Sequence, residues 1–237
     1  YQLSQKGYRV IAPDLPGHGK SNGIRGHFTM ELITKVIYDL TTYCRERYGN
    51  EIYIMGSSLG GITSFYCWAY DKRLKGAICH NAAILNEKAY KDIIKVKGMV
   101  KLLVPLVPTL AKFFPKIRMS VWKYLDLYKL AKSKEVLNRI ELLFKDPMVT
   151  QKYTLTSLKT QMRAPLANPI EKVKAPILLL VGGKDFLFSI DFMKEIYDRL
   201  PSENKDIKII ENASHLIFQE NLKESIQIIT QWLVKNK

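Results

Sequence analysis

The stretch Glu51–Ile62 constrains the fold more than any other part of the chain, because a short apolar run breaks abruptly into small residues and then resumes as an apolar, aromatic segment. This order predicts a strand, a tight turn and a helix. Within it, Gly56-Ser57-Ser58-Leu59-Gly60 fits the pattern G-x-S-x-G, in which glycines flank a serine on a strained strand-to-helix turn. We expect a side chain at Gly56 or Gly60 to collide with its neighbours in so sharp a turn. The pattern makes Ser58 the candidate nucleophile.

The helix that follows the serine is expected to extend to Tyr70 and to point its unpaired amides at the reaction centre. The backbone N–H of Leu59 can then receive an oxyanion. An ordinary glycine-rich turn can match the same five-residue pattern by chance, so the role of Ser58 depends on what the rest of the chain brings to it.

Two later segments supply an acid and a base. Ala175–Val181 is a near-continuous apolar run, as in a strand buried on both faces, and it ends in Gly-Gly-Lys-Asp185. Asp206–Glu211 predicts one more strand, and His215 follows on its exit loop. The carboxyl ends of parallel strands meet at one edge of the sheet, so Asp185 and His215 are expected to lie together. The order Ser, Asp, His distinguishes this arrangement from those of the chymotrypsin and subtilisin types.

Other residues of the same types are weaker candidates. His80 lies inside a predicted strand over Ala77–Ala82 and is expected to be a core histidine rather than a general base. Asp71, Asp126 and Asp191 do not follow a strand, so Asp185 is preferred as the acid.

Four motifs spread over nearly the whole chain carry a family resemblance: Gly7–Ser21, Gly56–Gly61, Gly182–Asp185 and Ala213–His215. On these the chain resembles the α/β-hydrolase superfamily, and most closely its monoacylglycerol lipase, lysophospholipase and related serine hydrolase branch. The segment Gly7–Ser21 is similar to the family's D-x-x-G-H-G-x-S turn. Many relatives have histidine where this chain has Ser57, a difference that is not expected to affect the nucleophile.

The resemblance implies an α/β fold with a mostly parallel sheet, helices on both faces and a helical cap insertion. Residues 1–83 and 168–237 would form the hydrolase core, and residues 84–167 the cap or lid. Ser58, Asp185 and His215 would be the catalytic triad, with the Leu59 amide in the oxyanion hole. No metal or cofactor is expected, because this chemistry needs neither.

The beginning of the chain does not match a whole member of the family. Tyr1–Gly7 would be the end of the first helix, directly before a strand at Arg9–Pro13, and the first three strands would be missing. The strands at Arg9–Pro13 and Ile52–Met55 would then lack the partner expected between them, so we interpret the sequence as a fragment. The loop that usually supplies a second oxyanion donor would be absent with the third strand.

The cap region mixes large apolar residues with lysines and is divided by Pro105, Pro108 and Pro115 into short predicted helices. Its stretch Ile93–Ile117 would form a lid that lines an acyl-chain pocket. The alternative is a cap core with solvated lysines. The candidate substrate-binding side chains are Leu102, Leu106, Phe113 and Phe114.

Composition limits the partners. The 237 residues, 47% of them hydrophobic, fit one α/β domain with an insertion, and the net charge is +15. Basic residues are spread from Lys6 to Lys237 without a nucleic-acid motif, so we expect no nucleic-acid partner. Peripheral contact with an anionic membrane is one explanation of the charge, and a genome rich in lysine and isoleucine is the other. Three scattered cysteines and no visible signal peptide favour a cytoplasmic protein of unknown oligomeric state.

The predicted function is hydrolysis of a carboxylic ester, with a monoacylglycerol or lysophospholipid as the expected lipid substrate. Other esters, thioesters and peptides, or acyl transfer to an alcohol, are alternatives within the enzyme class, because the fold supports many chemistries. A non-catalytic binding protein with the same fold is the alternative from another class.

Overall fold

The computed structural model describes residues 1–93 and 100–236. It divides into two compact units. The core unit consists of Tyr1–Pro13, Ile37–Ala83 and Leu166–Lys237, and the second unit of Asp14–Val36 and Ile84–Pro165.

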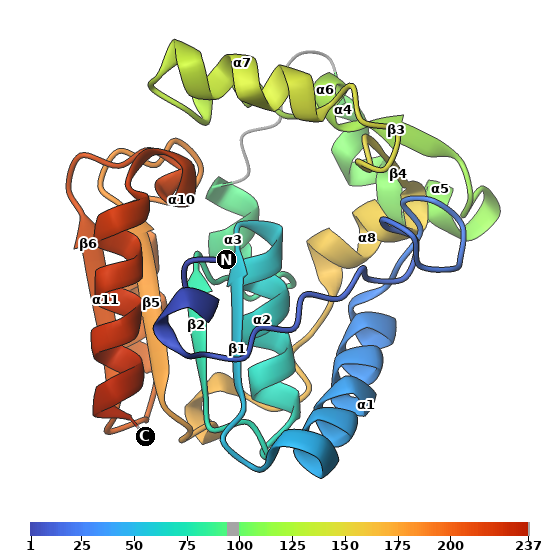
Figure 1. Cartoon of the computed structure of the whole chain (residues 1–237). Coiled ribbons are helices and arrows are strands. Elements are labelled where there is room, and N and C mark those ends of the chain that lie inside the picture. The colour runs from blue at the N-terminus through green and yellow to red at the C-terminus, as the bar shows by residue number, and fades with distance from the viewer. Residues whose placement is uncertain (94–99, 237) are drawn as a thin grey trace. The chain divides into compact units, whose positions relative to one another are not determined.

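A four-stranded parallel sheet forms the centre of the core unit (Figure 1), with the strand order β1-β2-β5-β6. The strands are β1 (Tyr53–Ser57), β2 (Gly76–His80), β5 (Ile177–Gly182) and β6 (Lys205–Ile210). Every residue of β2 and β5 is buried, as expected for apolar strands covered on both faces. The register pairs Ser57 with His80 and Gly182 with Ile210, so all four strands end at the same edge.

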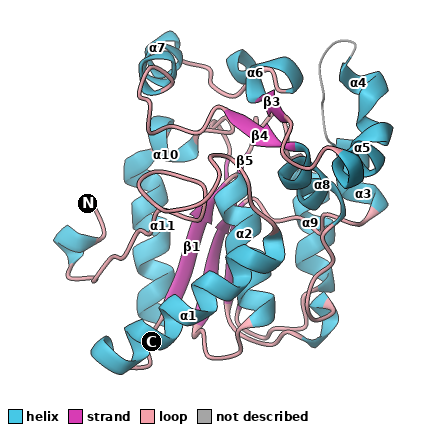
Figure 2. Cartoon of the chain, turned by 90° about the vertical axis from the view of Figure 1, so that its right-hand side faces the viewer, coloured by secondary structure: helices cyan, strands magenta, loops and turns pink. Residues whose placement is uncertain are grey.

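Helices cover both faces of this sheet, with α11 (Leu222–Lys235) on one side and α9 (Ile190–Arg199) on the other (Figure 2). The face toward α11 is closed by Ile229, Trp232 and Leu233, which pack against Leu178 and Leu180 of β5. The helices of the core unit are α2 (Leu59–Tyr70), α9 (Ile190–Arg199), α10 (Ile217–Glu220) and α11 (Leu222–Lys235), with η1 (Ser4–Lys6), η4 (Ile170–Lys172) and the part of α1 (Met30–Tyr48) from Ile37 onward.

Most expected elements of the core unit are confirmed. The helix after Ser58 ends at Tyr70, and strands lie at the predicted runs before Asp185 and before His215, as expected. The predicted strand at Arg9–Pro13 is wrong: these residues form no strand and are exposed. A strand requires a neighbour to complete its hydrogen bonds, and within the described chain no strand pairs with this segment.

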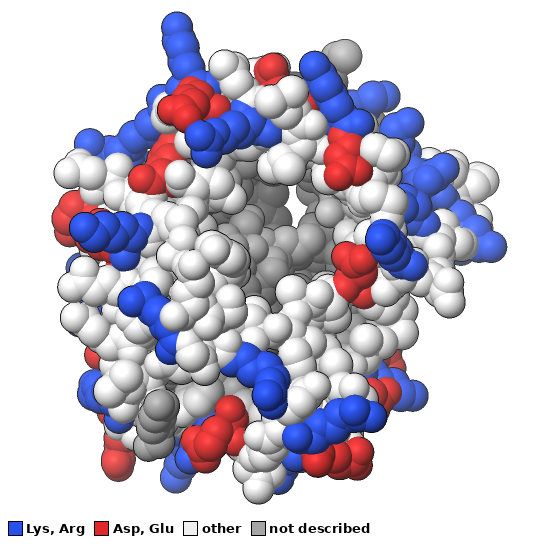
Figure 3. Space-filling model, in the orientation of Figure 1, with Lys and Arg blue, Asp and Glu red and all other residues white. Residues whose placement is uncertain are grey.

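The positive charge is dispersed. Figure 3 shows Lys and Arg side chains across the visible face, interspersed with Asp and Glu, in place of a single basic stripe. The net charge of +15 therefore does not by itself mark one binding surface.

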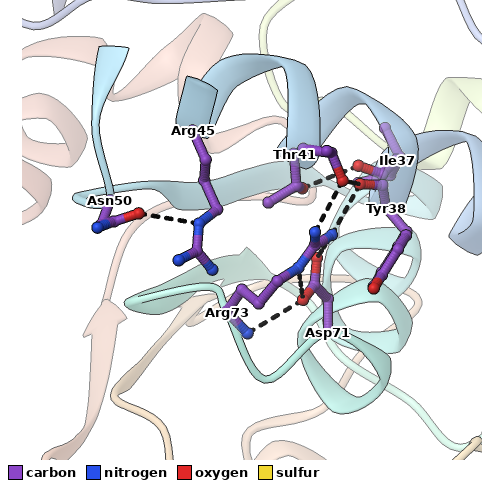
Figure 4. Close-up of polar contacts among 8 residues, drawn as sticks. Ile37, Tyr38, Thr41, Arg45, Asn50, Asp71 and Arg73 are labelled. Carbon is purple, nitrogen blue, oxygen red and sulfur yellow. Dashed lines mark hydrogen bonds and ion pairs between the residues drawn. The ribbon is translucent and has the colours of Figure 1, made fainter. Parts of the chain in front are cut away.

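Arg73 forms an ion pair within the turn after α2 and also bonds this turn to α1 (Figure 4). The Arg73 guanidinium donates to both oxygens of Asp71, each over 2.8 Å, and to the Tyr38 carbonyl over 2.8 Å. It also lies 3.6 Å from the centre of the Tyr38 ring. The Asp71 side chain is 2% exposed, so this pair satisfies a carboxylate that would otherwise be buried alone.

The second unit is built from short helices and a two-stranded antiparallel sheet. Its helix α5 (Val107–Phe113) packs on α8 (Leu155–Arg163) through Val107, Ala111, Leu155 and Leu158. Pro105 and Pro108 lie in the first turns of η2 (Val104–Leu106) and α5, which confirms that prolines divide this region. Residues 94–99 of the expected lid lie outside the described residues. The further elements are α3 (Lys88–Ile93), α4 (Val100–Leu103), η2 (Val104–Leu106), β3 (Arg118–Ser120), α6 (Val121–Tyr124), η3 (Leu127–Lys129), α7 (Lys134–Leu143) and β4 (Lys152–Thr154).

Across residues 1–93 and 100–236, none of the helices combines the length and the apolar character that a bilayer crossing requires.

Candidate active site

Ser58 lies between β1 and α2 in a backbone conformation that is rare for a side-chain-bearing residue. Its φ is 56° and its ψ is −122°. Only one other non-glycine residue of the described chain has a positive φ, Asn81. Such strain persists where the surrounding structure fixes it, and here the Ser58 amide donates to the His80 carbonyl over 3.0 Å while its own carbonyl accepts from Ile62. The strand-turn-helix prediction is therefore confirmed.

The glycines of this turn are needed for close approach, but not at both expected positions. A Cβ atom at Gly56 would lie 2.0 Å from the Gly60 carbonyl oxygen, which is far too close. The expectation for Gly60 is wrong, because a Cβ atom there would meet nothing within 4 Å. The second constrained position is Gly61, where a Cβ atom would lie 2.1 Å from the His80 carbonyl oxygen. The first turn of α2 thus packs directly on the end of β2.

The three residues expected to meet at the edge of the sheet lie within hydrogen-bond distance. His215 Nε2 is 2.7 Å from Ser58 Oγ, and His215 Nδ1 is 2.9 Å from Asp185 Oδ2. An ionised carboxylate only accepts, so Nδ1–H donates to Asp185 and Nε2 accepts the Ser58 hydroxyl. His215 and the Asp185 side chain are almost fully buried, and Phe188 stacks on the imidazole.

Two loops meet closely to make this contact possible. A Cβ atom at Gly182, the last residue of β5, would lie 2.2 Å from the Ser214 carbonyl oxygen. The amide of Lys184 donates to the Ala213 carbonyl over 2.9 Å. The loop after β5 and the loop after β6 are therefore joined by backbone contacts just before Asp185 and His215.

The carboxylate of Asp185 is held ionised by its donors. Burial alone would raise its pKa, but the hydrogen bond from His215 and the amides of Leu187 and Phe188 outweigh burial and lower the pKa below its ordinary value. The two amides donate to Oδ1 over 2.7 and 3.1 Å. A negative group is thus fixed against the His215 ring, where it would stabilise an imidazolium.

His80 is fully buried under the same site, in agreement with its expected place in the core. Burial, and then the neighbouring His215, lower the pKa of His80 to about 3, so its ring is neutral. Its Nδ1 lies 2.8 Å from Ser57 Oγ, and its Nε2 has no partner among the described residues. His80, Asp185 and His215 each have a potential metal-ligand atom, and these three atoms lie within 4.8 Å of one another. Asp185 and His215, however, already share a hydrogen bond.

Asn81 is a member of the site that the motifs do not indicate. Its Nδ2 donates to Asp185 Oδ2 over 3.2 Å, so this oxygen accepts from both Asn81 and His215. The usable signal in the sequence is position, since Asn81 directly follows a buried strand at the carboxyl edge of the sheet, where ligands bind in such folds.

The other residues singled out in the sequence lie outside this hydrogen-bonded group. Leu59 is the first residue of α2, so its amide has no partner within the helix. The rejected acids are placed elsewhere: Asp71 pairs with Arg73, Asp126 with Lys129, and Asp191 lies in the first turn of α9. The four side chains expected in a cap, Leu102, Leu106, Phe113 and Phe114, belong to the second unit and are 76, 51, 72 and 53% exposed.

Comparison with protein families gives a match over nearly the whole chain. The family model described as Hydrolase_4: Serine aminopeptidase, S33 matches residues 1–221. Among solved structures, the monoacylglycerol lipase of Paleococcus ferrophilus has a TM-score of 0.74 and 27% identity, over 94% of this chain and 81% of that one. A soluble variant of the monoglyceride lipase of Saccharomyces cerevisiae, in complex with a substrate analog, has a TM-score of 0.70 and 21% identity, over 94% and 76%.

Curated sequences give a similar result. A monoacylglycerol lipase of Mycolicibacterium smegmatis is 25% identical over 97% of this chain and 79% of its own length. An uncharacterized abhydrolase domain-containing protein of Dictyostelium discoideum is 28% identical over 98% of this chain, which spans only 24% of that larger protein.

Proposed function

We propose that this chain, which belongs to the Hydrolase_4 family (serine aminopeptidase, S33) and has the α/β-hydrolase fold, hydrolyses a carboxylic ester through an acyl-enzyme on Ser58. The observation that carries the proposal is the continuous hydrogen-bonded series from Ser58 Oγ through the His215 ring to Asp185. A serine whose hydroxyl meets a base, with the base oriented by a third group, is the arrangement of an activated nucleophile.

The three side chains act together in the proposed reaction. His215 Nε2 takes the Ser58 proton as Oγ attacks the ester carbonyl, and Asp185 holds the imidazole tautomer and stabilises the imidazolium. His215 then gives this proton to the departing alcohol. Water enters and loses a proton to the same nitrogen as its oxygen bonds to the acyl carbon. His215 then returns that proton to Ser58 Oγ as the bond to the acid breaks, so the acid leaves and the hydroxyl of Ser58 is restored.

The oxyanion of each tetrahedral intermediate needs donors that are already oriented. The Leu59 amide is one such donor, because it belongs to the first residue of a helix that begins directly after Ser58 and has no partner within that helix. We expect this donor to face the position where negative charge develops, and it would then stabilise the transition state more than the neutral ester.

A lipid ester with one acyl chain is the substrate class we favour. The support is that two similar proteins, from P. ferrophilus and M. smegmatis, are named monoacylglycerol lipases. The exposed apolar side chains Leu102, Leu106, Phe113 and Phe114 are the candidates for contact with the acyl chain. An ester of a lysophospholipid type would offer the same chain and the same carbonyl.

The test is labelling with a fluorophosphonate, followed by hydrolysis of a series of monoacylglycerols, lysophospholipids and p-nitrophenyl esters of increasing chain length. We expect labelling at Ser58 and a rise in kcat/KM with chain length. A folded protein that binds these esters but neither labels nor turns them over would be a binding protein instead. Preferential transfer of the acyl group to added glycerol would identify an acyltransferase, and turnover of peptides in preference to esters would contradict the proposed substrate.

We also propose that the second unit contacts an anionic lipid surface. Residues 93–125 contain seven Lys or Arg and no Asp or Glu. Within this segment Lys101, Lys112, Lys116 and Arg118 are exposed. Exposed with them are seven large apolar side chains: Leu102, Leu103, Leu106, Leu110, Phe113, Phe114 and Ile117.

The inner face of α5 packs on α8, so the apolar side chains on its outer face do not contribute to this packing and remain available for contact with lipid. Figure 3 shows Lys and Arg beside uncharged surface over the region where Figure 1 draws α5. An apolar surface bordered by cations fits the boundary between the headgroups and acyl chains of an anionic bilayer.

Sedimentation with lipid vesicles tests this contact separately from hydrolysis. We expect binding to vesicles with about 30% phosphatidylglycerol, weakened by salt, and little binding to pure phosphatidylcholine. Lys112→Glu with Lys116→Glu should lower the affinity at least about tenfold, at roughly 1 kcal/mol for each lost cation. The matched control is Lys172→Glu with Lys174→Glu, exposed lysines of the core unit. Equal loss of binding in the control would show that net charge alone is responsible.

A further inference from the structure

The dipeptide His80–Asn81, at the end of β2, contacts both the nucleophile turn and the acid. The His80 carbonyl accepts from the Ser58 amide, and the His80 ring holds the Ser57 hydroxyl. The Asn81 side chain donates to Asp185 Oδ2. This one dipeptide therefore contacts two parts of the site that are far apart in the sequence: the turn that carries the nucleophile, and the carboxylate that orients the base.

Asn81 is held in this place at a conformational cost. Its φ is 67°, and with Ser58 it is one of two non-glycine residues of the described chain with a positive φ. Asparagine is among the few residues that tolerate this region. Its backbone amide donates to the Leu180 carbonyl over 3.2 Å, so the strained conformation is fixed by the neighbouring strand β5.

The chemistry of the amide explains its orientation. Asn81 is fully buried, and its Oδ1 has no partner among the described residues. A buried unpaired carbonyl is unfavourable, so the contact on the other side of the amide has to offset it. That contact is a donation to an ionised carboxylate, which is stronger than one to a neutral acceptor. Turning the amide over would point oxygen at oxygen.

We propose that Asn81 is a positioning residue of the acid-base pair, whose amide N–H fixes the Asp185 oxygen that also accepts from His215. The inference rests on the proposed function for its effect on turnover. With the Leu187 and Phe188 amides on Oδ1, and Asn81 and His215 on Oδ2, Asp185 accepts from four donors, two on each oxygen. The His215 ring is thereby held at the angle at which Nε2 meets Ser58.

Asn81→Asp is the decisive variant, because it keeps the shape and the tolerance of positive φ while replacing the donor with a carboxyl group. The titratable groups that face it are His80 at the end of β2, Asp185 after β5 and His215 after β6. Two carboxyl groups that share a site cannot both ionise easily, so the new group remains protonated to a higher pH than usual. Protonated, it donates to Asp185 as the amide does, and ionised, it repels Asp185.

The expected result is a pH profile that the parent does not have. In Asn81→Asp, kcat should be within about threefold of the parent near pH 5.5 and fall about 10- to 100-fold below it near pH 8, with KM little changed. Asn81→Gly keeps the backbone conformation but has no donor, so its kcat should be lowered about tenfold at every pH.

Asn168→Asp is the matched control, since the Asn168 amide donates over 2.7 Å to the Ala69 carbonyl, away from the acid and base. It should lower the melting temperature without changing the pH dependence of kcat. Thermal melts of all variants establish that they are folded, and Asn81→Gly tests the same donor if Asn81→Asp does not fold.

A carbon-13 NMR titration of the Asp185 carboxyl group separates this inference from the proposed function. Loss of the donor in Asn81→Gly should raise the pKa of Asp185, whether or not the chain hydrolyses esters. An unchanged Asp185 titration, or a parent-like pH profile in Asn81→Asp, would overturn the inference. A raised Asp185 pKa in a protein that turns over no ester would leave the contact established and the proposed function contradicted.

Discussion

His215 Nε2 lies 2.7 Å from Ser58 Oγ, although 157 positions separate the two residues in the chain. If Ser58 is the nucleophile, Ser58→Ala should abolish fluorophosphonate labelling and lower kcat by at least about 10³-fold. Ser57→Ala is the informative neighbour, because it removes an adjacent hydroxyl that bonds His80 and not His215. It should still label, at a rate within about tenfold of the parent. Labelling that survives in Ser58→Ala would identify a different nucleophile.

Asp185→Asn tests the acid. The amide is nearly the same size as the carboxylate but cannot hold the His215 tautomer or stabilise its imidazolium, so kcat should fall about 10³- to 10⁴-fold. KM should change much less, since no ester contact is removed. Asp191→Asn, an exposed position in the first turn of α9, is the control and should retain parent kinetics. Comparable losses in both variants would exclude a specific role for Asp185.

Much of this site could be predicted from the sequence, because its parts are local patterns with a fixed relation to a parallel sheet. The apolar run before Gly182 and the small residues around Ser58 each identify a strand and the loop that leaves it. Parallel strands place all such loops at one edge, so Ser58, Asp185 and His215 could be brought together without knowledge of any distance.

What could not be predicted depends on contacts between distant backbones. Gly61 has no signal of its own, since its constraint is the carbonyl of His80 on another strand. The contact of Asn81 with Asp185 depends on a positive φ that no pattern indicates. Arg9–Pro13 has the composition of a strand, but a strand also requires a neighbouring strand, which composition does not supply.

The two adjacent glycines of α2 should respond oppositely to alanine. Gly61→Ala would place a Cβ atom 2.1 Å from the His80 carbonyl oxygen, so the helix has to move from β2, and we expect a loss of about 3 kcal/mol or more in the free energy of unfolding. Gly60→Ala meets nothing within 4 Å and should be neutral or stabilising by up to about 1 kcal/mol. Urea denaturation of both variants measures the difference. Equal losses would show that the backbone of α2 at Gly61 does not lie so close to the His80 carbonyl.

The Asp71–Arg73 pair should contribute to stability and not to catalysis. Asp71→Asn leaves the Arg73 guanidinium without its bidentate partner, and we expect a loss of about 2–3 kcal/mol in the free energy of unfolding, because the carboxylate is buried and the guanidinium only partly exposed. The exposed pair Glu135–Arg139 is the comparison, and Glu135→Gln should change stability by less than about 0.5 kcal/mol. Denaturant unfolding monitored by circular dichroism gives both values. A parent-like stability in Asp71→Asn would mean that the pair is not closed in solution.

His80 should make the protein less stable as the pH falls. Its folded pKa is lowered to about 3 by burial and then by His215, whereas an unfolded histidine titrates near pH 6.5. Below about pH 6.5 the unfolded chain therefore binds a proton that the folded chain does not, and stability is lost progressively until the folded pKa is reached. Between pH 8 and pH 5 this amounts to about 2 kcal/mol.

The His80→Gln variant isolates that contribution. Glutamine does not titrate, so the stability of the variant should fall about 2 kcal/mol less than that of the parent over the same interval, whatever its stability at pH 8. Urea unfolding at several pH values between 5 and 8 gives the two curves. Parallel curves would mean that His80 takes up a proton in the folded protein as readily as in the unfolded chain, which would contradict its burial against His215.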